Sequence, residues 1–233
     1  MVQVTNLTVQ YTKADEQAVL QDISFSVPAG ERLALIGANG AGKSTLLLAL
    51  IGVIKPLRGE MVINGVPVKE ERLRELRQTA GMVFQNPEDQ LFMPTVQDDI
   101  AFGLRNYGFD EQSAGARTGA ILERLGIGHL KARMSHKLSG GEKRMAALAG
   151  VLVMEPSLLL LDEPSSFLDP RSRRNLITVL ASLPQTMIIA THDLDLALAL
   201  CPRTLFLKTG RIFADGPAGE LLRDPALLEQ CGL

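Results

Sequence analysis

The sequence of 233 residues has no tryptophan, two tyrosines, three histidines and two cysteines. Cys201 and Cys231 are too few for a disulfide framework and have no metal-binding spacing, so we expect two free thiols in a reducing cytoplasm. A net charge of −2 argues against a general nucleic-acid binder, which would show a basic stripe, and no nucleic-acid partner is predicted. The N-terminus lacks the basic and apolar regions of a secretion signal, and the longest apolar stretch, residues 46–54, is too short to cross a bilayer. These absences predict a cytoplasmic protein.

Hydrophobic residues make up 46% of the chain, as in ordinary globular proteins, and they follow two patterns. Alternation predicts antiparallel strands at 2–11 and 23–27, and Asn64-Gly65 predicts a hairpin turn. Short, wholly apolar runs predict parallel strands buried on both faces, at 80–84, 158–161 and 187–190. Helical spacing is found at 116–125, 141–154, 171–183 and 194–200. Since no convincing strand lies between 86 and 156, we expect a helical lobe there, inserted between two strands of an α/β core.

Residues 37–44 read GANGAGKS and match the pattern G-x-x-x-x-G-K-S/T. This octapeptide lies between an apolar run at 32–36 and a helical run at 45–54, which is the strand, loop and helix context that the pattern needs. Its glycines allow backbone N–H groups to cradle phosphate oxygens, and the positive end of the following helix favours the same anion. We therefore predict a nucleotide site in which Lys43 reaches the β- and γ-phosphates and Ser44 ligates Mg²⁺. The alternative is a glycine-rich turn without a ligand.

Two further segments place polar residues after buried strands. Residues 158–163 read LLLLDE, and there Asp162 is suited to hold Mg²⁺ while Glu163 is suited to position and deprotonate a water. His192 follows the run at 187–190, where open α/β sheets place their ligands, and a neutral imidazole there can bridge the γ-phosphate and the water. The alternatives are an acidic pair that caps a strand and a structural histidine.

Residues 138–142, LSGGE, begin a long helical run and form a second anion-binding device without a lysine. The chain would thus have two phosphate-binding segments, 37–44 and 138–142, for one nucleotide. A symmetric dimer explains this, because the loop at 37–44 of each subunit can face the segment 138–142 of its partner. The alternative is an N-cap by Ser139. His129 and His136 have no partner spacing and are expected at the surface.

These elements, in this order, resemble an ATP-binding-cassette (ABC) transporter ATPase subunit, and the resemblance covers about residues 2–216. It implies an α/β fold of the P-loop NTPase class, with a RecA-like core, an antiparallel β edge and an inserted helical lobe. One ABC ATPase domain would span 1–233, with the nucleotide-binding core at 1–86 and 156–233 and the helical lobe at 87–155. The implied reaction is ATP hydrolysis coupled to transmembrane transport, with ATP and Mg²⁺ bound.

The resemblance also implies roles for individual residues. Those that contact ATP would be Tyr11, Gly37, Ala38, Asn39, Gly40, Ala41, Gly42, Lys43, Ser44 and Thr45. Tyr11 would stack on adenine; the alternative is a tyrosine that ends a strand. The catalytic set would be Lys43, Gln85, Glu163 and His192, with Ser44, Gln85 and Asp162 at Mg²⁺. The signature segment would act on the partner's nucleotide through Ser139, Gly140, Gly141 and Glu142, and Asp169 would close the D-loop at 166–169.

A finer resemblance lies in FQNPEDQLF at 84–92, DDIAFG at 98–103 and LSGGEKR at 138–144. These segments are similar to the ATPases of energy-coupling-factor importers, and among them to the cobalt and nickel branch. The resemblance implies a homodimer, or a heterodimer with a related ATPase, on the inner face of the cell membrane. It also implies integral membrane subunits for coupling and for substrate capture. A vitamin importer of the same type is the alternative, and a soluble, non-transport ABC ATPase is a more distant one.

Two positions depart from the family pattern. Glu142 stands where many cassettes have glutamine, and Phe167 stands where most have alanine or glycine, so the affinity of the dimer is in question. The segment 86–92 is expected to meet a membrane subunit, with Leu91 and Phe92 either exposed to that partner or packed inside the helical lobe. The transported substrate is not specified by the sequence.

Overall fold

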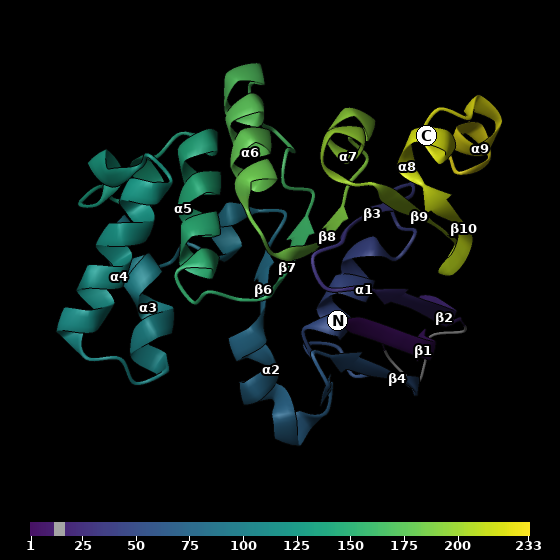
Figure 1. The fold of residues 1–233 in the computed structure, drawn as a ribbon, viewed down its shortest axis with the longest axis horizontal. Helices are drawn as coiled ribbons and strands as arrows, with labels where there is room; N and C mark the ends of the chain where they lie inside the picture. The colour runs from purple at the N-terminus through teal and green to yellow at the C-terminus, as the bar shows by residue number, and fades with distance from the viewer. Residues whose placement is uncertain (12–16) are drawn as a thin grey trace. The chain divides into compact units, whose positions relative to one another are not determined.

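The computed structural model describes residues 1–11 and 17–233, and the chain divides into two units (Figure 1). The first unit comprises residues 1–82, 157–163 and 184–233, and the second comprises 83–156 and 164–183. The sequence assigns 164–183 to the nucleotide-binding core. In the structure this segment groups with the second unit, because its helix α6 packs against helix α5 of that unit.

A six-stranded sheet in the order β10-β9-β3-β8-β7-β6 forms the centre of the first unit. Its strands are β3 (Arg32–Ile36), β6 (Ala80–Val83), β7 (Leu158–Asp162), β8 (Thr186–Ala190), β9 (Arg203–Lys208) and β10 (Arg211–Pro217). Strands β7 and β8 are buried at every position, as their uninterrupted apolar sequences predict. At about 1.5–3 kcal/mol for each buried large aliphatic side chain, these strands hold much of the stability of this unit.

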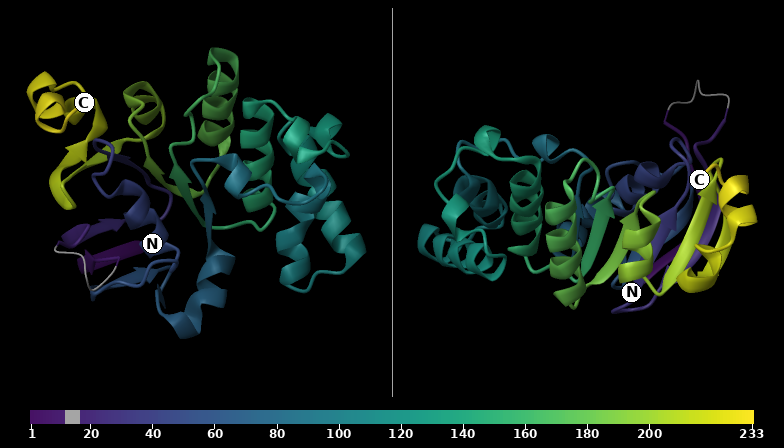
Figure 2. Two further views of the ribbon diagram at one scale, coloured as in Figure 1. Left: turned by 180° about the vertical axis from the view of Figure 1, so that it is seen from behind. Right: turned by 90° about the horizontal axis from the view of Figure 1, so that it is seen from above.

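The strand order decides where the functional loops lie. Strand β8 pairs in parallel with β3 on one side and with β7 on the other, although β7 precedes β8 in the sequence. The loops that leave the carboxyl ends of these three strands therefore emerge side by side. Helix α1 (Lys43–Leu50) follows the loop after β3 and packs against β7 and β8 (Figure 2).

A second, antiparallel sheet has the order β2-β1-β4-β5. Its strands are β1 (Val2–Val9), β2 (Leu20–Val27), β4 (Arg58–Ile63) and β5 (Val66–Pro67). Asn64 and Gly65 form the two-residue turn between β4 and β5, with φ of 52° and 78°. This confirms the predicted hairpin, since both central residues of such a turn need a positive φ.

Residues 203–217, for which the sequence patterns predict no strand, form the hairpin of β9 and β10. Its turn, Thr209-Gly210, also has positive φ at both positions. A side chain at Gly210 would overlap the carbonyl oxygen of Val19, so this turn needs glycine for close approach as well as for its conformation. Helices α2 (Leu73–Thr79), α7 (Leu194–Leu200), α8 (Ala218–Leu221) and α9 (Pro225–Gln230) complete this unit.

The second unit is helical, as predicted for the segment between β6 and β7. Its α-helices are α3 (Val96–Asn106), α4 (Glu111–Arg124), α5 (Gly140–Leu152) and α6 (Pro170–Ser182). Helices α3, α4 and α5 contact one another and appear together in teal and green in Figure 1. Both His129 and His136 are exposed, as expected. In the part of the chain that the structure describes, no helix combines the length and apolar character needed to span a membrane.

Candidate nucleotide site

The loop at 37–42 wraps tightly between β3 and α1. Gly40 and Gly42 have φ of 79° and 106°, where side chains other than glycine are strained. A Cβ atom at Gly37 would overlap the carbonyl oxygen of Leu207, and one at Gly42 would lie 2.7 Å from a methyl group of Leu20. The three glycines of the octapeptide are thus required by backbone conformation, by close packing or by both.

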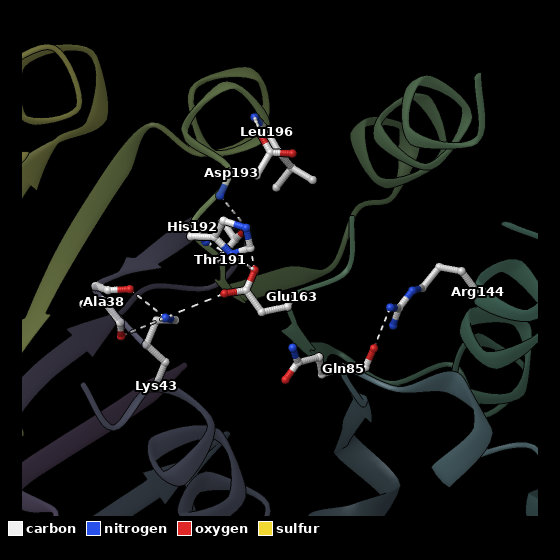
Figure 3. A network of polar contacts seen from close by, with 10 residues as sticks. Ala38, Lys43, Gln85, Arg144, Glu163, Thr191, His192, Asp193 and Leu196 are labelled. Atoms are coloured by element: carbon white, nitrogen blue, oxygen red, sulfur yellow. Dashed lines mark hydrogen bonds and ion pairs between the residues drawn. The ribbon is translucent and has the colours of Figure 1, made fainter. Parts of the chain in front are cut away.

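Lys43 is the first residue of α1, and its side chain is buried. The Nζ atom donates hydrogen bonds to the carbonyl oxygens of Gly37 at 2.6 Å and Ala38 at 3.3 Å. It also lies 3.7 Å from Oε1 of Glu163. The ammonium group is therefore held inside the loop by two backbone carbonyls, and it faces the carboxylate of Glu163 (Figure 3).

Glu163 directly follows β7 and is 5% exposed. Its φ of 43° lies in the left-handed region, which is unusual for a residue other than glycine and is frequent at functional sites. Its N–H donates to the carbonyl of Ala190 at 2.8 Å, which anchors the turn to the end of β8. This turn aims the carboxylate toward the residues that follow β8.

Oxygen Oε2 of Glu163 accepts three contacts from Thr191 and His192 (Figure 3). The Thr191 hydroxyl donates at 3.1 Å, the His192 N–H at 3.3 Å, and Nδ1 of His192 lies at 2.9 Å. The hydroxyl of Thr191 also accepts a bond from the N–H of Asp193 at 3.0 Å, which directs its proton toward Glu163. Thr191 is a functional residue that the sequence analysis missed, and the signal for it is the Thr-His-Asp triplet that ends the apolar run of β8.

The contact between Nδ1 and Glu163 restricts what His192 can do. Because Glu163 can only accept when ionised, Nδ1 of His192 must carry a proton, and the Nε2 atom of a neutral ring is then an acceptor. In this orientation a neutral His192 can accept a hydrogen bond from water, whereas donating one to a phosphate requires a second ring proton or a rotated ring. The side chain is 60% exposed, so solvent and ligands can reach Nε2.

Ser44 and Asp162 are the residues of this unit predicted at Mg²⁺. Asp162 is buried at the last position of β7, and Ser44 is exposed in the first turn of α1. In residues 1–11 and 17–233, no three His, Cys, Asp or Glu side chains are grouped to hold a metal ion. One carboxylate and one hydroxyl suit Mg²⁺, which is usually held by one or two carboxylates together with waters and substrate phosphates. The donor set therefore fits the predicted ion.

Tyr11 is 57% exposed and offers a ring face to solvent. Its hydroxyl lies 2.8 Å from Oγ1 of Thr45, the residue that follows Ser44 on α1. The tyrosine is thus tied to the helix that begins at the phosphate loop.

In the second unit, Ser139 is the N-cap of α5. Its hydroxyl accepts from the N–H of Glu142 at 3.4 Å, and the Glu142 carboxylate accepts from the N–H of Ser139 at 2.8 Å. This reciprocal pair is a capping box, and the bonds from Ser139 lower the pKa of Glu142. The acid that departs from the family pattern thus has a local structural role. Ser139 and Gly140 are exposed, so the cap leaves this helix end open to solvent.

Asp169 is the N-cap of α6 in the same unit. Its carboxylate accepts from the N–H groups of Arg171 and Ser172 and from the Ser172 hydroxyl, and these bonds lower its pKa. A Cβ atom at Gly141 would overlap Ser172, so glycine there lets the starts of α5 and α6 approach closely. Phe167 is 95% exposed with a φ of 62°.

Gln85 also belongs to the second unit, and its backbone has a partner that the sequence analysis missed. Arg144, on α5, is buried, and its guanidinium donates to the carbonyl of Phe84 at 2.6 Å and to that of Gln85 at 2.7 Å; Figure 3 shows the contact with Gln85. The sequence carries no signal for this contact, because the partners of Arg144 are backbone carbonyls.

The segment 86–92 is partly committed to its own unit. The Glu88 carboxylate pairs with Lys143 of α5, so this acid is engaged within its own unit. Phe92 is 63% exposed and meets Phe102 edge to face, with ring centroids 4.9 Å apart. Phe92 is therefore not packed inside the helical lobe.

The fold and the first-unit site define a phosphate-loop ATPase, with a buried lysine after the loop that follows β3 and a buried carboxylate directly after β7, the two parallel strands that flank β8. The ABC transporter family model matches residues 20–166, and the chain belongs to this family. As a member of it, the chain binds ATP and is an ATPase with the ABC cassette fold.

Relatives agree with this assignment over nearly the whole chain. A predicted ABC transporter ATP-binding protein of Gloeobacter violaceus is 49% identical over 96% of this chain and 92% of its own length. The energy-coupling factor transporter ATP-binding protein EcfA of Methanothermobacter thermautotrophicus is 40% identical over 100% of this chain and 76% of its own. The structure of cbiO1 from Clostridium perfringens, part of the ABC transporter complex cbiONQ, superposes with a TM-score of 0.85. It is 36% identical and the match covers 98% of this chain and 93% of that one.

Proposed function

We propose that this chain is the ATP-hydrolysing subunit that energises a membrane importer, for cobalt or nickel ions. The observation that carries the catalytic part is the Glu163 carboxylate, which is buried and held by Thr191 and His192 opposite the Lys43 ammonium. A fixed carboxylate that faces a phosphate-binding lysine suits the base that positions water for in-line attack on the γ-phosphate.

Each site residue predicted in the first unit then has a role in that reaction. Lys43 and the N–H groups of the loop from Gly37 to Thr45 bind the phosphates, and Tyr11 stacks on the adenine. His192 orients the attacking water through Nε2, because its Nδ1 proton is engaged by Glu163. Ser44 and Asp162 would hold Mg²⁺, whose charge would offset the negative charge of the phosphates.

The resemblance to the family also implies roles for residues of the second unit. Gln85 is proposed to act at Mg²⁺ and the water. Ser139, Gly140, Gly141 and Glu142 are proposed to bind the nucleotide of a partner subunit, and Asp169 is proposed to act at the D-loop. The exposed N-terminus of α5 supports this, since its free N–H groups and dipole favour an anion.

The importer type is supported by the relatives named EcfA and cbiO1 and by the segments at 84–92 and 98–103. We propose a homodimer at the inner face of the membrane, bound to integral subunits for coupling and substrate capture. Substrate selectivity lies in those subunits, since the described residues of this chain offer no cluster for a transported metal. The nearest alternative is a vitamin importer of the energy-coupling-factor type, the transporter type that the name of the EcfA relative gives.

A transport assay separates the two substrates. The chain and the membrane subunits that co-purify with it would be reconstituted in vesicles and supplied with ATP, and the uptake of Co²⁺, Ni²⁺ and a panel of vitamins would be measured. We expect metal uptake that a Lys43→Ala complex does not support. Uptake of a vitamin with no metal uptake would replace the leading substrate by the alternative.

The composite dimer has its own test. Lys43→Ala damages one half of a site and Ser139→Arg the other, so a mixed dimer regains one intact site when the halves come from different chains. We expect each variant to be inactive alone and the mixture to recover part of the ATPase activity. Hydrolysis by a monomer, with a specific activity independent of protein concentration, would contradict the proposal.

A further inference from the structure

Arg144 occupies an unusual position in the second unit. The residues that follow it on α5 are apolar and buried, and Arg144 itself is 2% exposed. Burying a guanidinium costs several kcal/mol unless its donors are satisfied, and an apolar side chain is often at least as stable in such a place. The arginine is therefore placed for something that a methionine or leucine cannot do.

The contacts of Arg144 show what that is. Its two terminal nitrogens donate to the carbonyls of consecutive residues, Phe84 and Gln85. In an extended strand consecutive carbonyls point to opposite sides, so two that meet one guanidinium require the chain to turn. Strand β6 ends at Val83, directly before this turn. Arg144 thus fixes the backbone at the point where Gln85 leaves the strand.

A second side chain, that of Gln90, also ties this turn to α5. Gln90 accepts from the N–H of Phe84 at 3.3 Å and donates to the carbonyl of Ala147, on α5, at 2.9 Å. Both backbone groups of Phe84 are therefore tied to α5, the carbonyl by Arg144 and the N–H by Gln90. The helix that carries these anchors is the one whose N-cap is Ser139.

We propose that Arg144 is a positioning residue for ATP hydrolysis, which fixes the two carbonyls of Phe84 and Gln85 to α5 and so sets the orientation of the Gln85 side chain. The inference rests on the proposed role of Gln85 in hydrolysis. The planar guanidinium is essential because it can reach two carbonyls at once, whereas a lysine ammonium offers no fixed fork.

A double-mutant cycle tests this proposal in the purified chain. We expect Arg144→Met to lower kcat about 10-fold to 100-fold, because a misplacement of about 1 Å has effects of that size. The KM for ATP should stay within about twofold, and Arg144→Lys should recover only part of kcat. In a Gln85→Ala background, Arg144→Met should cause little further loss, because the residue through which it acts is gone.

Arg105→Met serves as the matched control, since Arg105 makes a two-pronged contact with Glu111 on the surface of the same unit and should leave kcat unchanged. If Arg144 had a purely structural role, Arg144→Met would lower the unfolding temperature, and its loss of kcat would add to that of Gln85→Ala. Such additivity would overturn this inference but leave the proposed role of Gln85 intact. An unchanged kcat in Gln85→Ala would refute the proposed role of Gln85, and the inference with it. If Arg144→Met does not fold, Arg144→Lys supplies the same cycle.

Discussion

Replacing Glu163 by glutamine removes one negative charge from the centre of the first-unit site and keeps the shape of the side chain. The amide oxygen can still accept from Thr191 and His192, and the new NH₂ group then faces Lys43. Lys43 keeps its two carbonyl partners, Gly37 and Ala38, so the phosphate loop should keep its form. The variant therefore separates the chemistry of the carboxylate from the structure around it.

Three magnitudes follow. Loss of a positioned base should lower kcat about 10²-fold or more, or about 2.7 kcal/mol in the barrier. Without ATP, the buried Lys43 loses its carboxylate at 3.7 Å, and the free energy of unfolding should fall by about 1–3 kcal/mol. With ATP bound, the γ-phosphate is no longer repelled by the Glu163 carboxylate. The free energy of ATP binding should become more favourable by about 1 kcal/mol, which makes binding roughly five-fold tighter.

Three measurements check these values: steady-state ATP hydrolysis, equilibrium binding of ATP, and thermal unfolding with and without ATP. We expect ATP to raise the unfolding temperature more in Glu163→Gln than in the wild type. Size-exclusion chromatography should also show an ATP-bound dimer that persists. Glu60→Gln on β4 is the matched control, because that glutamate is exposed and should change none of these quantities.

Hydrolysis at the wild-type rate would show that Glu163 is not the base. If ATP binding were lost instead, the carboxylate would be needed to hold Lys43 in place for the phosphates. Either result would contradict the reasoning from the structure.

Three further predictions address other parts of the chain. His192→Ala should lower kcat about 10-fold to 100-fold with little change in KM, in steady-state assays, because Glu163 loses one of its donors and the water loses its acceptor; an unchanged kcat would assign the ring a structural role only. Gly141→Ala should destabilise the chain by about 1–3 kcal/mol in urea unfolding, since its Cβ would lie 2.8 Å from that of Ser172, whereas Gly150→Ala on the same helix has open space and should stabilise it by about 0.5–1 kcal/mol. Burial raises the pKa of Cys201 to about 12, so this thiol should react with a disulfide reagent at pH 8 only after unfolding, and rapid labelling of the native chain at Cys201 would contradict its burial.

Several elements could be read from the sequence because they depend on neighbours along the chain. Patterns of about ten residues or fewer predict three of them: the strand, loop and helix around Lys43, the turn at Asn64-Gly65, and the buried strand before Asp162. Glycine spacing, a two-residue turn and an uninterrupted apolar run are local consequences of backbone sterics and burial. They are sufficient to predict an α/β core and to identify Lys43 and Glu163 as candidate site residues.

Tertiary structure alone decided how these pieces meet. An apolar run reveals that a strand is buried but not which strands lie beside it, so the placement of β8 between β3 and β7 had no signal in the sequence. That order brings Thr191 and His192 to Glu163, and Glu163 to Lys43. The buried Arg144 was equally hidden, because its partners are backbone carbonyls, which every residue possesses and no residue type announces. Pairing between distant segments is set by the packing of the whole unit, and the pattern of any single segment records only its own burial.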